Sequence, residues 1–153
     1  MKSPDRLWYD IAYRYAKQSK CRSRHVGCVL VYEDRSIGQG WNGAPDGSSV
    51  NDCKREKCCN SCIKSGVGLS DAICCHAEIN CIGYCARHGV ATRGSTLYCT
   101  TFPCLYCAGA LVAAGVREVV YDVMYGEEED NKITFTIFEK AKVKVRRFSF
   151  DDE

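Results

Sequence analysis

The chain has 153 residues, of which 46% are hydrophobic and 26% are charged, a composition typical of a soluble globular protein with one core. Its 21 Lys and Arg residues nearly balance its 19 Asp and Glu residues, and the formal net charge is +2. This charge gives no general electrostatic argument for binding a long nucleic acid, whereas a small anionic substrate needs only a few placed cations. We therefore expect a single domain over residues 1–153 and no long nucleic acid partner.

The N-terminus and the cysteine content bear on the compartment. The start, MKSPDRLWYD, carries a proline and acidic residues where a signal peptide needs an apolar run. No stretch approaches the roughly 18 apolar residues of a membrane span, so we expect a cytoplasmic protein without a membrane partner. In a reducing compartment the 13 cysteines are more often metal ligands or small buried residues than disulfide partners.

A helix is the first element predicted along the chain, over residues 5–19 after Pro4. Residues 26–34 are rich in β-branched side chains and predict a strand, which a tight turn joins to residues 36–43 as a hairpin. Residues 44–70 show neither period, and a loop of this length inside a compact domain needs a reason, such as a metal staple. The apolar stripe of the first helix is predicted from helical spacing to comprise Leu7, Trp8, Ile11, Ala12 and Tyr15.

The second half of the chain predicts alternating helices and strands. Helical spacing covers residues 76–88, and a strand pattern covers residues 95–101. Pro103 then begins a second helix of this half, which Gly115 ends. Residues 117–123 predict the next strand.

The following segment is harder to interpret. The acidic run EEED at residues 127–130 is most simply a solvated loop. Residues 133–141 alternate like a strand, yet the spacing of Ile137 and Phe138 also fits a short helix, so both interpretations stay open. Residues 142–148 predict a last strand. The order of helix, hairpin and then alternating helices and strands predicts an α/β layered domain with a partly parallel sheet.

Two short motifs contain residues that could hold a metal ion. Cys104 and Cys107 lie at a helix start with a spacing that places both sulfurs on one face. The partial positive charge of a helix N-terminus stabilises thiolates, the form that binds zinc. His76 lies at the start of another helix, so three ligands could meet and leave a fourth zinc position for water, as in catalytic sites. Glu78, close behind His76, is placed to act as a base toward that water.

Each motif alone has a plainer explanation. A Cys-x-x-Cys pair often belongs to a structural zinc knuckle, and Cys59 with Cys62 could supply the other half, although the two pairs lie farther apart than is typical. A buried histidine is also often structural. Together, HAE at 76–78 and PCLYC at 103–107 match the known signature of zinc-dependent nucleobase deaminases.

Beyond these motifs, the chain resembles the cytidine/deoxycytidylate deaminase superfamily along nearly its whole length. The similar segments are SKCRSRHVGCVLV, GQGWNGAPDG, HAEINCI and TLYCTTFPCLYCAGALVAAGVREVVY. HAE with PCxxC identifies only the superfamily, whereas GWNGAP, TTFPC and the VREVVY strand with Tyr125 after it are similar to the deoxycytidylate (dCMP) deaminase branch. The resemblance implies a three-layer α/β/α fold around a central mixed sheet of about five strands.

The chemistry that the resemblance implies is hydrolytic deamination of dCMP to dUMP and ammonia. Zinc activates water for attack on C4 of cytosine, and Glu78 takes a proton from the water, delivers it to N3 and helps to protonate the leaving ammonia. A preference for dCMP over dCTP does not follow from the sequence.

Several residues are candidates for contact with the substrate. The resemblance places Asn42 at the sugar, Ala77 against the substrate and Tyr125 at the sugar–phosphate end. Ser23 and Arg24 are the phosphate candidates, because an anion in a small pocket needs a few donors and a cation. Arg24 could equally be a plain surface arginine, and Asn42, in a glycine-flanked turn, could also make the turn.

Family members of this kind are often homohexamers that dCTP activates and dTTP inhibits, with Mg²⁺ accompanying the triphosphate effectors. The resemblance places Gly40, Trp41 and Gly43 near the effector site. It places Tyr84 and Arg87 on the helix through which relatives couple the two sites. The plainer functions are packing for Tyr84 and a solvent-facing charge for Arg87.

Many dCMP deaminases also hold a second, structural zinc ion between the first helix–strand turn and the long loop. By resemblance, Cys21, Cys53 and Cys58 fall at matching places. More thiols than one zinc ion can use are candidates for the remaining ligands: Cys59, Cys62, Cys74 and Cys75. Four others lie within helix or strand patterns and are expected in the core: Cys28, Cys81, Cys85 and Cys99.

Two rival functions remain. One is a deaminase that acts on polynucleotides, such as the tRNA adenosine branch, which the basic tail KAKVKVRR favours, while the near-neutral charge and GWNGAP disfavour it. Lysines on an edge strand also serve to block association between sheets. The other is a zinc-stapled binding module without catalysis, in which replacing Glu78 by Gln would change nothing measurable.

Overall fold

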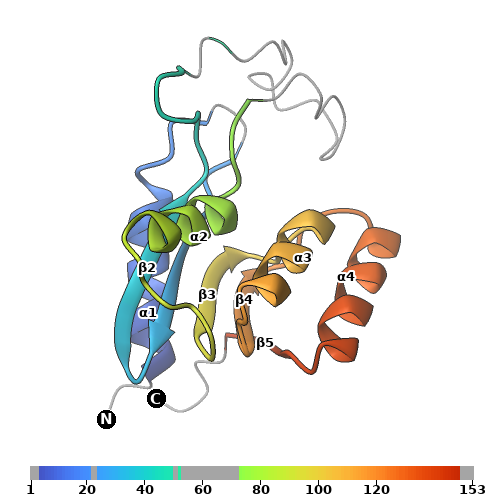
Figure 1. The fold of residues 1–153 in the computed structure, drawn as a ribbon. Helices are drawn as coiled ribbons and strands as arrows, with labels where there is room; N and C mark the ends of the chain where they lie inside the picture. The colour runs from blue at the N-terminus through green and yellow to red at the C-terminus, as the bar shows by residue number, and fades with distance from the viewer. Residues whose placement is uncertain (1–3, 22–23, 50–51, 53–72, 149–153) are drawn as a thin grey trace.

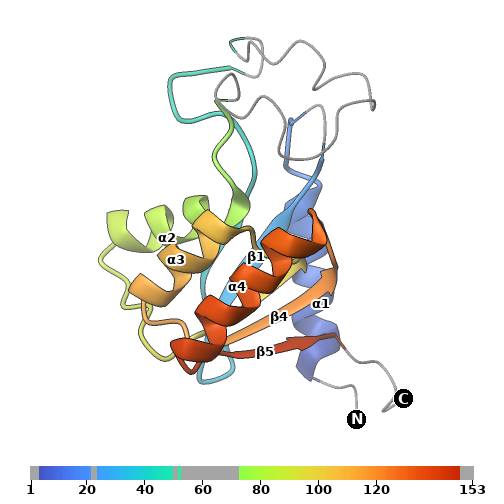
Figure 2. The same cartoon turned by 90° about the vertical axis from the view of Figure 1, so that its right-hand side faces the viewer.

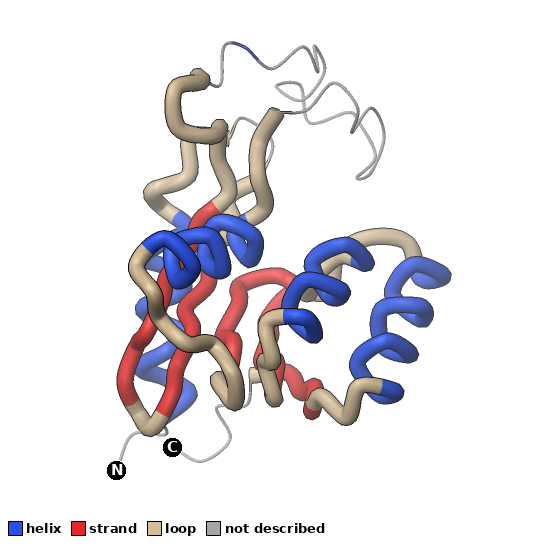
Figure 3. The backbone as a smooth tube through the Cα atoms, in the orientation of Figure 1, coloured by secondary structure: helices blue, strands red, loops and turns tan. Residues whose placement is uncertain are grey.

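The computed structural model describes residues 4–21, 24–49, 52 and 73–148, in which helices and strands follow one another in nearly the predicted order (Figures 1 and 3). The elements are α1 (Pro4–Ala16), β1 (Gly27–Tyr32), β2 (Arg35–Trp41), α2 (Ala77–Arg87), β3 (Thr96–Thr101), α3 (Leu105–Ala113), β4 (Glu118–Val123), α4 (Glu128–Lys140) and β5 (Lys144–Arg147). The predicted hairpin is confirmed as β1 and β2, and the predicted alternation is confirmed from α2 to β4.

The strands form one five-stranded mixed sheet in the order β2-β1-β3-β4-β5. β1 runs antiparallel to both β2 and β3. β3, β4 and β5 are parallel to one another, with α3 and α4 as the connections between them. The expected central mixed sheet is therefore confirmed.

Helices cover both faces of the sheet, as Figure 2 shows. On one face, α1 packs on β1 and β3 through a small core that includes Trp8, Ala12 and Tyr98. On the other face, α2, α3 and α4 share a larger core in which Leu97 and Phe138 are fully buried. The result is the predicted three-layer α/β/α arrangement. The four cysteines expected in the core, Cys28, Cys81, Cys85 and Cys99, all lie fully buried in the larger cluster.

Glycines in the hairpin allow two helices to approach the sheet closely. A Cβ atom on Gly27 would lie 2.2 Å from the carbonyl oxygen of Ala12 in α1. A Cβ atom on Gly40 would lie 2.1 Å from the carbonyl oxygen of Ala77 at the start of α2. Both separations are far below van der Waals contact, so side chains at these positions would push the helices away from the sheet. The glycine at position 40 therefore allows the first turn of α2 to lie directly against β2.

The segment after β4 differs from part of its prediction. The acidic run at residues 127–130 is not a solvated loop, because it forms the N-cap and first turn of α4. Acidic side chains there are favoured by the positive end of the helix dipole. Residues 133–140 continue as helix, with Thr134 and Phe138 as its buried side chains. Thr134 can be buried because its hydroxyl donates to the carbonyl of Asp130 at 3.0 Å.

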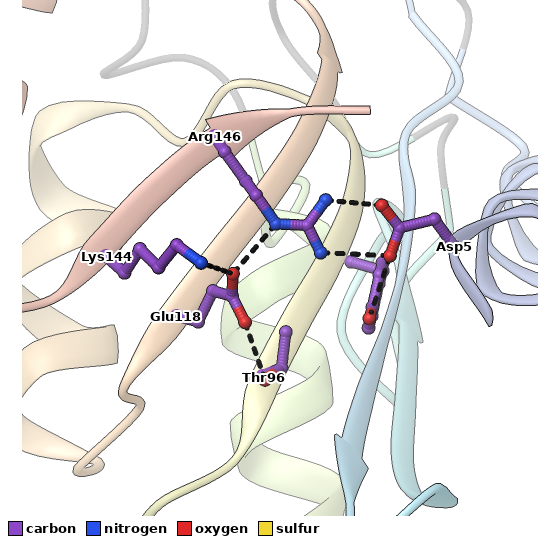
Figure 4. Close-up of polar contacts among 6 residues, drawn as sticks. Asp5, Thr96, Glu118, Lys144 and Arg146 are labelled. Atoms are coloured by element: carbon purple, nitrogen blue, oxygen red, sulfur yellow. Dashed lines mark hydrogen bonds and ion pairs between the residues drawn. The ribbon is translucent and has the colours of Figure 1, made fainter. Parts of the chain in front are cut away.

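The predicted apolar stripe of α1 was partly wrong. Leu7 is 55% exposed, whereas Asp5 and Ala16 are buried together with Trp8 and Ala12. Asp5 can be buried because its carboxylate pairs with Arg146 of β5 (Figure 4). No helix within the described ranges is long and apolar enough to cross a membrane.

Candidate active site

Four strand ends meet at one edge of the sheet. Trp41 at the end of β2 lies opposite Gly27 at the start of β1, and Thr101 at the end of β3 lies opposite Val123 at the end of β4. Because β1 is antiparallel to β3, its start lies beside the end of β3. The chain leading into α2 approaches this edge together with the loop that follows β2 (Figure 3). This edge gathers the residues that the sequence singled out.

Three of the predicted metal ligands lie together at this edge. His76 is the N-cap of α2, Cys104 is the N-cap of α3, and Cys107 lies one turn into α3. The Nδ1 atom of His76 lies 3.4 Å from Sγ of Cys104 and 3.3 Å from Sγ of Cys107. The three ligand atoms all lie within 4.8 Å of one another.

This geometry suits a tetrahedral zinc ion. Zinc bond lengths to imidazole nitrogen and thiolate sulfur, taken at a tetrahedral angle, separate the two ligand atoms by about 3.6 Å. The observed separations of 3.3 Å and 3.4 Å are close to this value. Glu78 is not a member of the cluster in the described part of the chain. One nitrogen and two sulfurs are a donor set typical of zinc sites that keep an open position.

The thiols and the imidazole of the cluster shift one another's protonation. A hydrogen bond with Cys107 and another with His76 lower the pKa of Cys104 to about 4. The same bond between the two sulfurs raises the pKa of Cys107, since Cys107 retains the proton. The hydrogen bond with Cys104 raises the pKa of His76, and burial acts against this. The hydrogen bonds within the cluster therefore favour the thiolate form of Cys104, which is the form that binds zinc.

Glu78 lies in the first turn of α2 and is only 4% exposed. Burial raises the pKa of its carboxyl, an effect that the charge of His76 and a hydrogen bond with Cys107 partly offset. A general acid–base group works best when its pKa approaches the working pH, and burial shifts this carboxyl in that direction. Ala77, next to it, is fully buried against Gly40.

The candidate phosphate residues Arg24 and Tyr125 contact each other. The guanidinium carbon of Arg24 lies 3.7 Å from the centre of the Tyr125 ring. The Nη1 atom of Arg24 is buried and has no hydrogen-bond partner among the described residues. Burying a cationic donor without an acceptor costs free energy. A bound anion that accepts from this donor would offset the cost. Ser23 lies outside the described residues.

Asn42 uses its side chain to hold the start of β1. Its amide oxygen accepts a hydrogen bond from the backbone of Val26 at 2.8 Å, and its amide nitrogen donates to the carbonyl of Arg24 at 2.7 Å. Its own carbonyl accepts from the hydroxyl of Ser19 at 2.8 Å. These side-chain bonds reach residues that are remote in sequence and form no local turn, so the structure does not show the turn-making alternative, and contact with a sugar stays a prediction.

The residues expected near an effector site have structural contacts of their own. Trp41 stacks on Tyr15 of α1, and Gly43 forms an isolated β-bridge with Cys75. On α2, Tyr84 packs against His88. Arg87, also on α2, forms an exposed ion pair with Asp46 at 3.1 Å, which connects the end of the helix to the loop after β2.

The candidates for a second zinc site are only partly described. Cys21 is buried, while Cys74 and Cys75 are half-buried. Within the described ranges none of these three thiols belongs to a group of side chains that could hold a metal ion, since the group found there consists of His76, Cys104 and Cys107. The other predicted ligands lie outside the described residues: Cys53, Cys58, Cys59 and Cys62.

One residue of the site was missed by the sequence reasoning. Asn80, in α2, donates a side-chain hydrogen bond to the carbonyl of Trp41 at 2.8 Å. The available signal was an asparagine inside a helix, where its amide competes for backbone groups and is unfavourable unless it finds a partner elsewhere.

Comparison with known proteins agrees with this geometry. The family model for the "cytidine and deoxycytidylate deaminase zinc-binding region" matches residues 2–123. The deoxycytidylate deaminase of Saccharomyces cerevisiae is 36% identical over 149 residues, which are 97% of this chain and 46% of the relative. The chain thus spans less than half the length of this yeast protein. The deoxycytidylate deaminase of Mycobacterium phage D29 is 35% identical over 128 residues, 76% of this chain and 92% of that protein.

Solved structures share the fold. The dCMP deaminase of cyanophage S-TIM5 in its apo form superposes with a TM-score of 0.75 at 24% identity, covering 97% of this chain and all of that one. The family model matches most of the chain, and the matched range contains all three residues of the cluster, His76, Cys104 and Cys107. The chain belongs to the cytidine and deoxycytidylate deaminase family.

Proposed function

We propose that the protein is a zinc-dependent enzyme that hydrolyses dCMP to dUMP and ammonia in the cytoplasm. The observation that carries the proposal is the cluster of His76, Cys104 and Cys107 together with a buried carboxyl nearby. That carboxyl belongs to Glu78, which lies in the first turn of α2, the helix that His76 begins. The relatives named deoxycytidylate deaminase favour this nucleotide over other substrates of the family. The cyanophage protein has been solved in complex with dCMP and dUMP, the proposed substrate and product.

The proposed mechanism divides the chemistry between the metal and the carboxyl. His76, Cys104 and Cys107 would hold zinc, which when bound supplies Lewis acidity that activates water near neutral pH. Glu78 would accept a proton from the attacking water as the water oxygen bonds to C4, and would deliver that proton to N3 of the pyrimidine. It then helps to transfer a proton to the departing amino group, so that dCMP and water give dUMP and ammonia. Because Glu78 is buried, bulk water does not compete for these protons.

Arg24 and Tyr125 would bind the 5′-phosphate. The buried Nη1 of Arg24, which has no hydrogen-bond partner among the residues that the structure describes, is a donor that a phosphate oxygen would satisfy, with the charge of the guanidinium complementing the anion. The ring of Tyr125 supports the guanidinium from one side through the cation–π contact. Asn42 would orient Arg24 through the backbone, in addition to the sugar contact suggested by resemblance.

Regulation and assembly form a second level of the proposal. We propose a homo-oligomer, a hexamer by resemblance, that responds to dCTP and dTTP with Mg²⁺ near Gly40, Trp41 and Gly43. The ion pair of Arg87 with Asp46 supports a connection between α2 and the loop after β2. Apolar side chains exposed on the outer helices support association between copies: Ile79, Tyr84, Tyr106, Ile133 and Phe135.

A second, structural zinc ion is proposed to join Cys21 to the cysteines at residues 53–62, with Cys74 or Cys75 as a further ligand. Metal analysis of the purified protein tests it, with two zinc ions per chain as the expected result and one as the result that contradicts it. A double variant, Cys53→Ser with Cys58→Ser, should lose one zinc and keep the catalytic one.

The function itself is tested by ammonia release from a panel of substrates. The protein is incubated with dCMP, dCTP, cytidine and a tRNA, and we expect turnover of dCMP. Turnover of tRNA alone would favour the polynucleotide deaminase, and zinc binding without any turnover would favour the binding module. The basic tail gives the tRNA alternative little support, because Arg146 and Lys144 pair with Glu118 (Figure 4).

A further inference from the structure

Asn80 connects the helix of the proposed catalytic residues to the end of β2. It lies in the same part of α2 as Glu78, and its side-chain amide donates to the carbonyl oxygen of Trp41 at 2.8 Å. Asparagine is a poor residue for a helix interior, because its amide competes with the backbone. Here the amide bonds outside the helix, to a residue that is remote in sequence.

Trp41, Asn42 and Gly43, the 41–43 segment, lead from this bond to the proposed phosphate site. Asn42 follows Trp41, and its side chain donates to the carbonyl of Arg24 and accepts from the amide of Val26. The backbone at Arg24 is therefore held by the 41–43 segment. The guanidinium of Arg24 in turn lies over Tyr125.

The other anchors of the 41–43 segment come from outside α2. The hydroxyl of Ser19, after α1, donates to the carbonyl of Asn42 at 2.8 Å. Gly43 pairs with Cys75 through two backbone hydrogen bonds, of 2.8 Å and 3.1 Å, in the chain that leads to His76. Just before the segment, Gly40 lies so close to Ala77 that α2 cannot move toward β2. Asn80 supplies a polar contact between the body of α2 and this segment.

We propose that Asn80 is a positioning residue that sets the distance between Glu78 and the phosphate-binding side chain of Arg24. It does so by fixing the carbonyl of Trp41, and thereby Asn42, relative to α2. The inference rests on the proposed function, since it takes Glu78 as the group at the reacting ring and Arg24 as the group at the phosphate. A substrate that lacks the phosphate should then be indifferent to Asn80.

The experiment compares Asn80→Ala with the unchanged protein on dCMP and on deoxycytidine, which has no phosphate. We expect kcat/KM for dCMP to fall about two- to tenfold, the effect of one neutral hydrogen bond, mainly through KM. The value for deoxycytidine should stay within about twofold. In an Arg24→Ala background, Asn80→Ala should have no further effect on dCMP, because the two changes act through one path.

Matched variants separate positioning from stability. Gly83→Ala lies on the same helix, is exposed and meets no atom within 4 Å, so both substrates should be turned over unchanged. Asn80→Asp replaces the donor by an acceptor facing the carbonyl of Trp41, and it should impair dCMP turnover at least as much as Asn80→Ala. Equal losses on dCMP and deoxycytidine, or losses that add to those of Arg24→Ala, would overturn the proposal.

Hydrogen exchange gives a readout that does not depend on turnover. In Asn80→Ala the backbone amides of Val26 and Gly43, which are bonded in the 41–43 network, should exchange faster than in the unchanged protein. Unchanged exchange there would contradict the positioning role. If the unchanged protein does not deaminate dCMP, the proposed function fails while this measurement still tests the link.

Discussion

At the scale of single residues, the site depends on where two helices begin. His76 and Cys104 are N-caps with extended backbone, and neither uses its side chain to cap its own helix. Ser, Thr, Asp or Asn would normally occupy these positions and satisfy the free N–H groups. The chain gives up that stabilisation, and the two side chains point at a common point instead. Such departures from local preference are typical of functional sites.

Replacing Glu78 by Gln tests the proton-transfer role directly. The amide keeps the shape of the side chain but cannot carry a proton, so kcat for dCMP should fall about a hundredfold to ten-thousandfold. Zinc content should stay unchanged, because Glu78 is not part of the ligand cluster. Steady-state kinetics and metal analysis are the measurements.

The matched control is Cys104→Ser, which removes a predicted ligand one helix away. Cys104→Ser should lose activity together with the zinc ion proposed at the His76, Cys104 and Cys107 cluster, whereas Glu78→Gln should lose activity alone. If Glu78→Gln kept kcat within about threefold, proton transfer by this carboxyl would be ruled out, since general acid–base catalysis contributes far more.

The sequence predicted these residues but not their surroundings. Cys104 and Cys107 are constrained by helical spacing within one turn, and HAE adds two more residues whose roles follow from their chemistry. The bond of Asn80 to Trp41 and those of Asn42 to Arg24 and Val26 join distant parts of the chain. Nothing in local periodicity encodes such pairs, because they depend on how β1, β2 and α2 meet in three dimensions.

At the scale of secondary-structure elements, three helices end in the same way. The residue after each C-cap has positive φ: Gly89 (65°) after α2, Gly115 (77°) after α3 and Lys142 (57°) after α4. In each case the next residue is a valine whose amide donates back into the helix, at 2.8 Å to 3.1 Å. This is the Schellman motif. It favours glycine at the residue with positive φ, because glycine has no Cβ atom to clash in the left-handed region.

Lys142→Gly should therefore stabilise the protein. Relief of the left-handed strain outweighs the extra freedom that glycine gives the unfolded chain, so we expect a gain of about 0.5–1 kcal/mol in the free energy of unfolding. For a chain of this size that corresponds to a rise of about 1–4 °C in Tm. Urea and thermal unfolding are the measurements.

The reverse change at α2 provides the control. Gly89 occupies the equivalent position, and a Cβ atom there would meet nothing within 4 Å, so Gly89→Ala changes backbone strain alone. It should destabilise by about 1 kcal/mol. A loss of stability in Lys142→Gly would mean that the lysine side chain contributes more than its backbone strain removes.

Residues 133–141 could be interpreted from the sequence either as a strand or as a short helix. Alternating threonine and apolar residues suit a strand, and the core-facing positions of α4 include Thr134, which periodicity counts as polar. The hydroxyl of Thr134 donates to the carbonyl of Asp130, which satisfies its hydrogen-bonding requirement within the core. Three features outside the hydrophobic periodicity favour the helix over the strand: an acidic first turn, a Schellman motif at the C-terminus and packing of Phe138 beside Phe102.

At the scale of the whole molecule, Arg146 joins the two ends of the described fold. Its guanidinium binds both carboxylate oxygens of Asp5 in the first turn of α1, and its Nε donates to Glu118 of β4 at 2.8 Å (Figure 4). The phenol of Tyr98 donates to Asp5 as well, at 3.2 Å. One side chain on the edge strand β5 therefore attaches α1 to the parallel half of the sheet, a contact that no local pattern predicted.

This network should make stability depend on pH. The hydrogen bond with Arg146 is the main cause that lowers the pKa of Asp5. Burial raises the pKa of Glu118, but the bond and charge of Arg146 prevail and the net shift is downward. A lowered carboxyl pKa stabilises the fold above the ordinary value of about 4, and the stabilisation is lost as pH falls through the lowered value.

Arg146→Met should therefore destabilise at pH 7 and matter progressively less in acid. We expect a loss of about 1–2 kcal/mol at pH 7, a moderate value because the Arg146 side chain is 32% exposed and water screens part of the interaction. As the pH falls through the lowered pKa values, both carboxyls become protonated and the difference from the unchanged protein should shrink. Taking the difference at each pH removes the titration of the cluster at His76, which both proteins share.

Lys144→Met is the matched control, because Lys144 is 71% exposed and contacts the same Glu118 at 3.4 Å. It should change stability by less than about 0.5 kcal/mol. A constant difference between Arg146→Met and the unchanged protein across this range would show that Arg146 acts through packing and not through the two carboxylates.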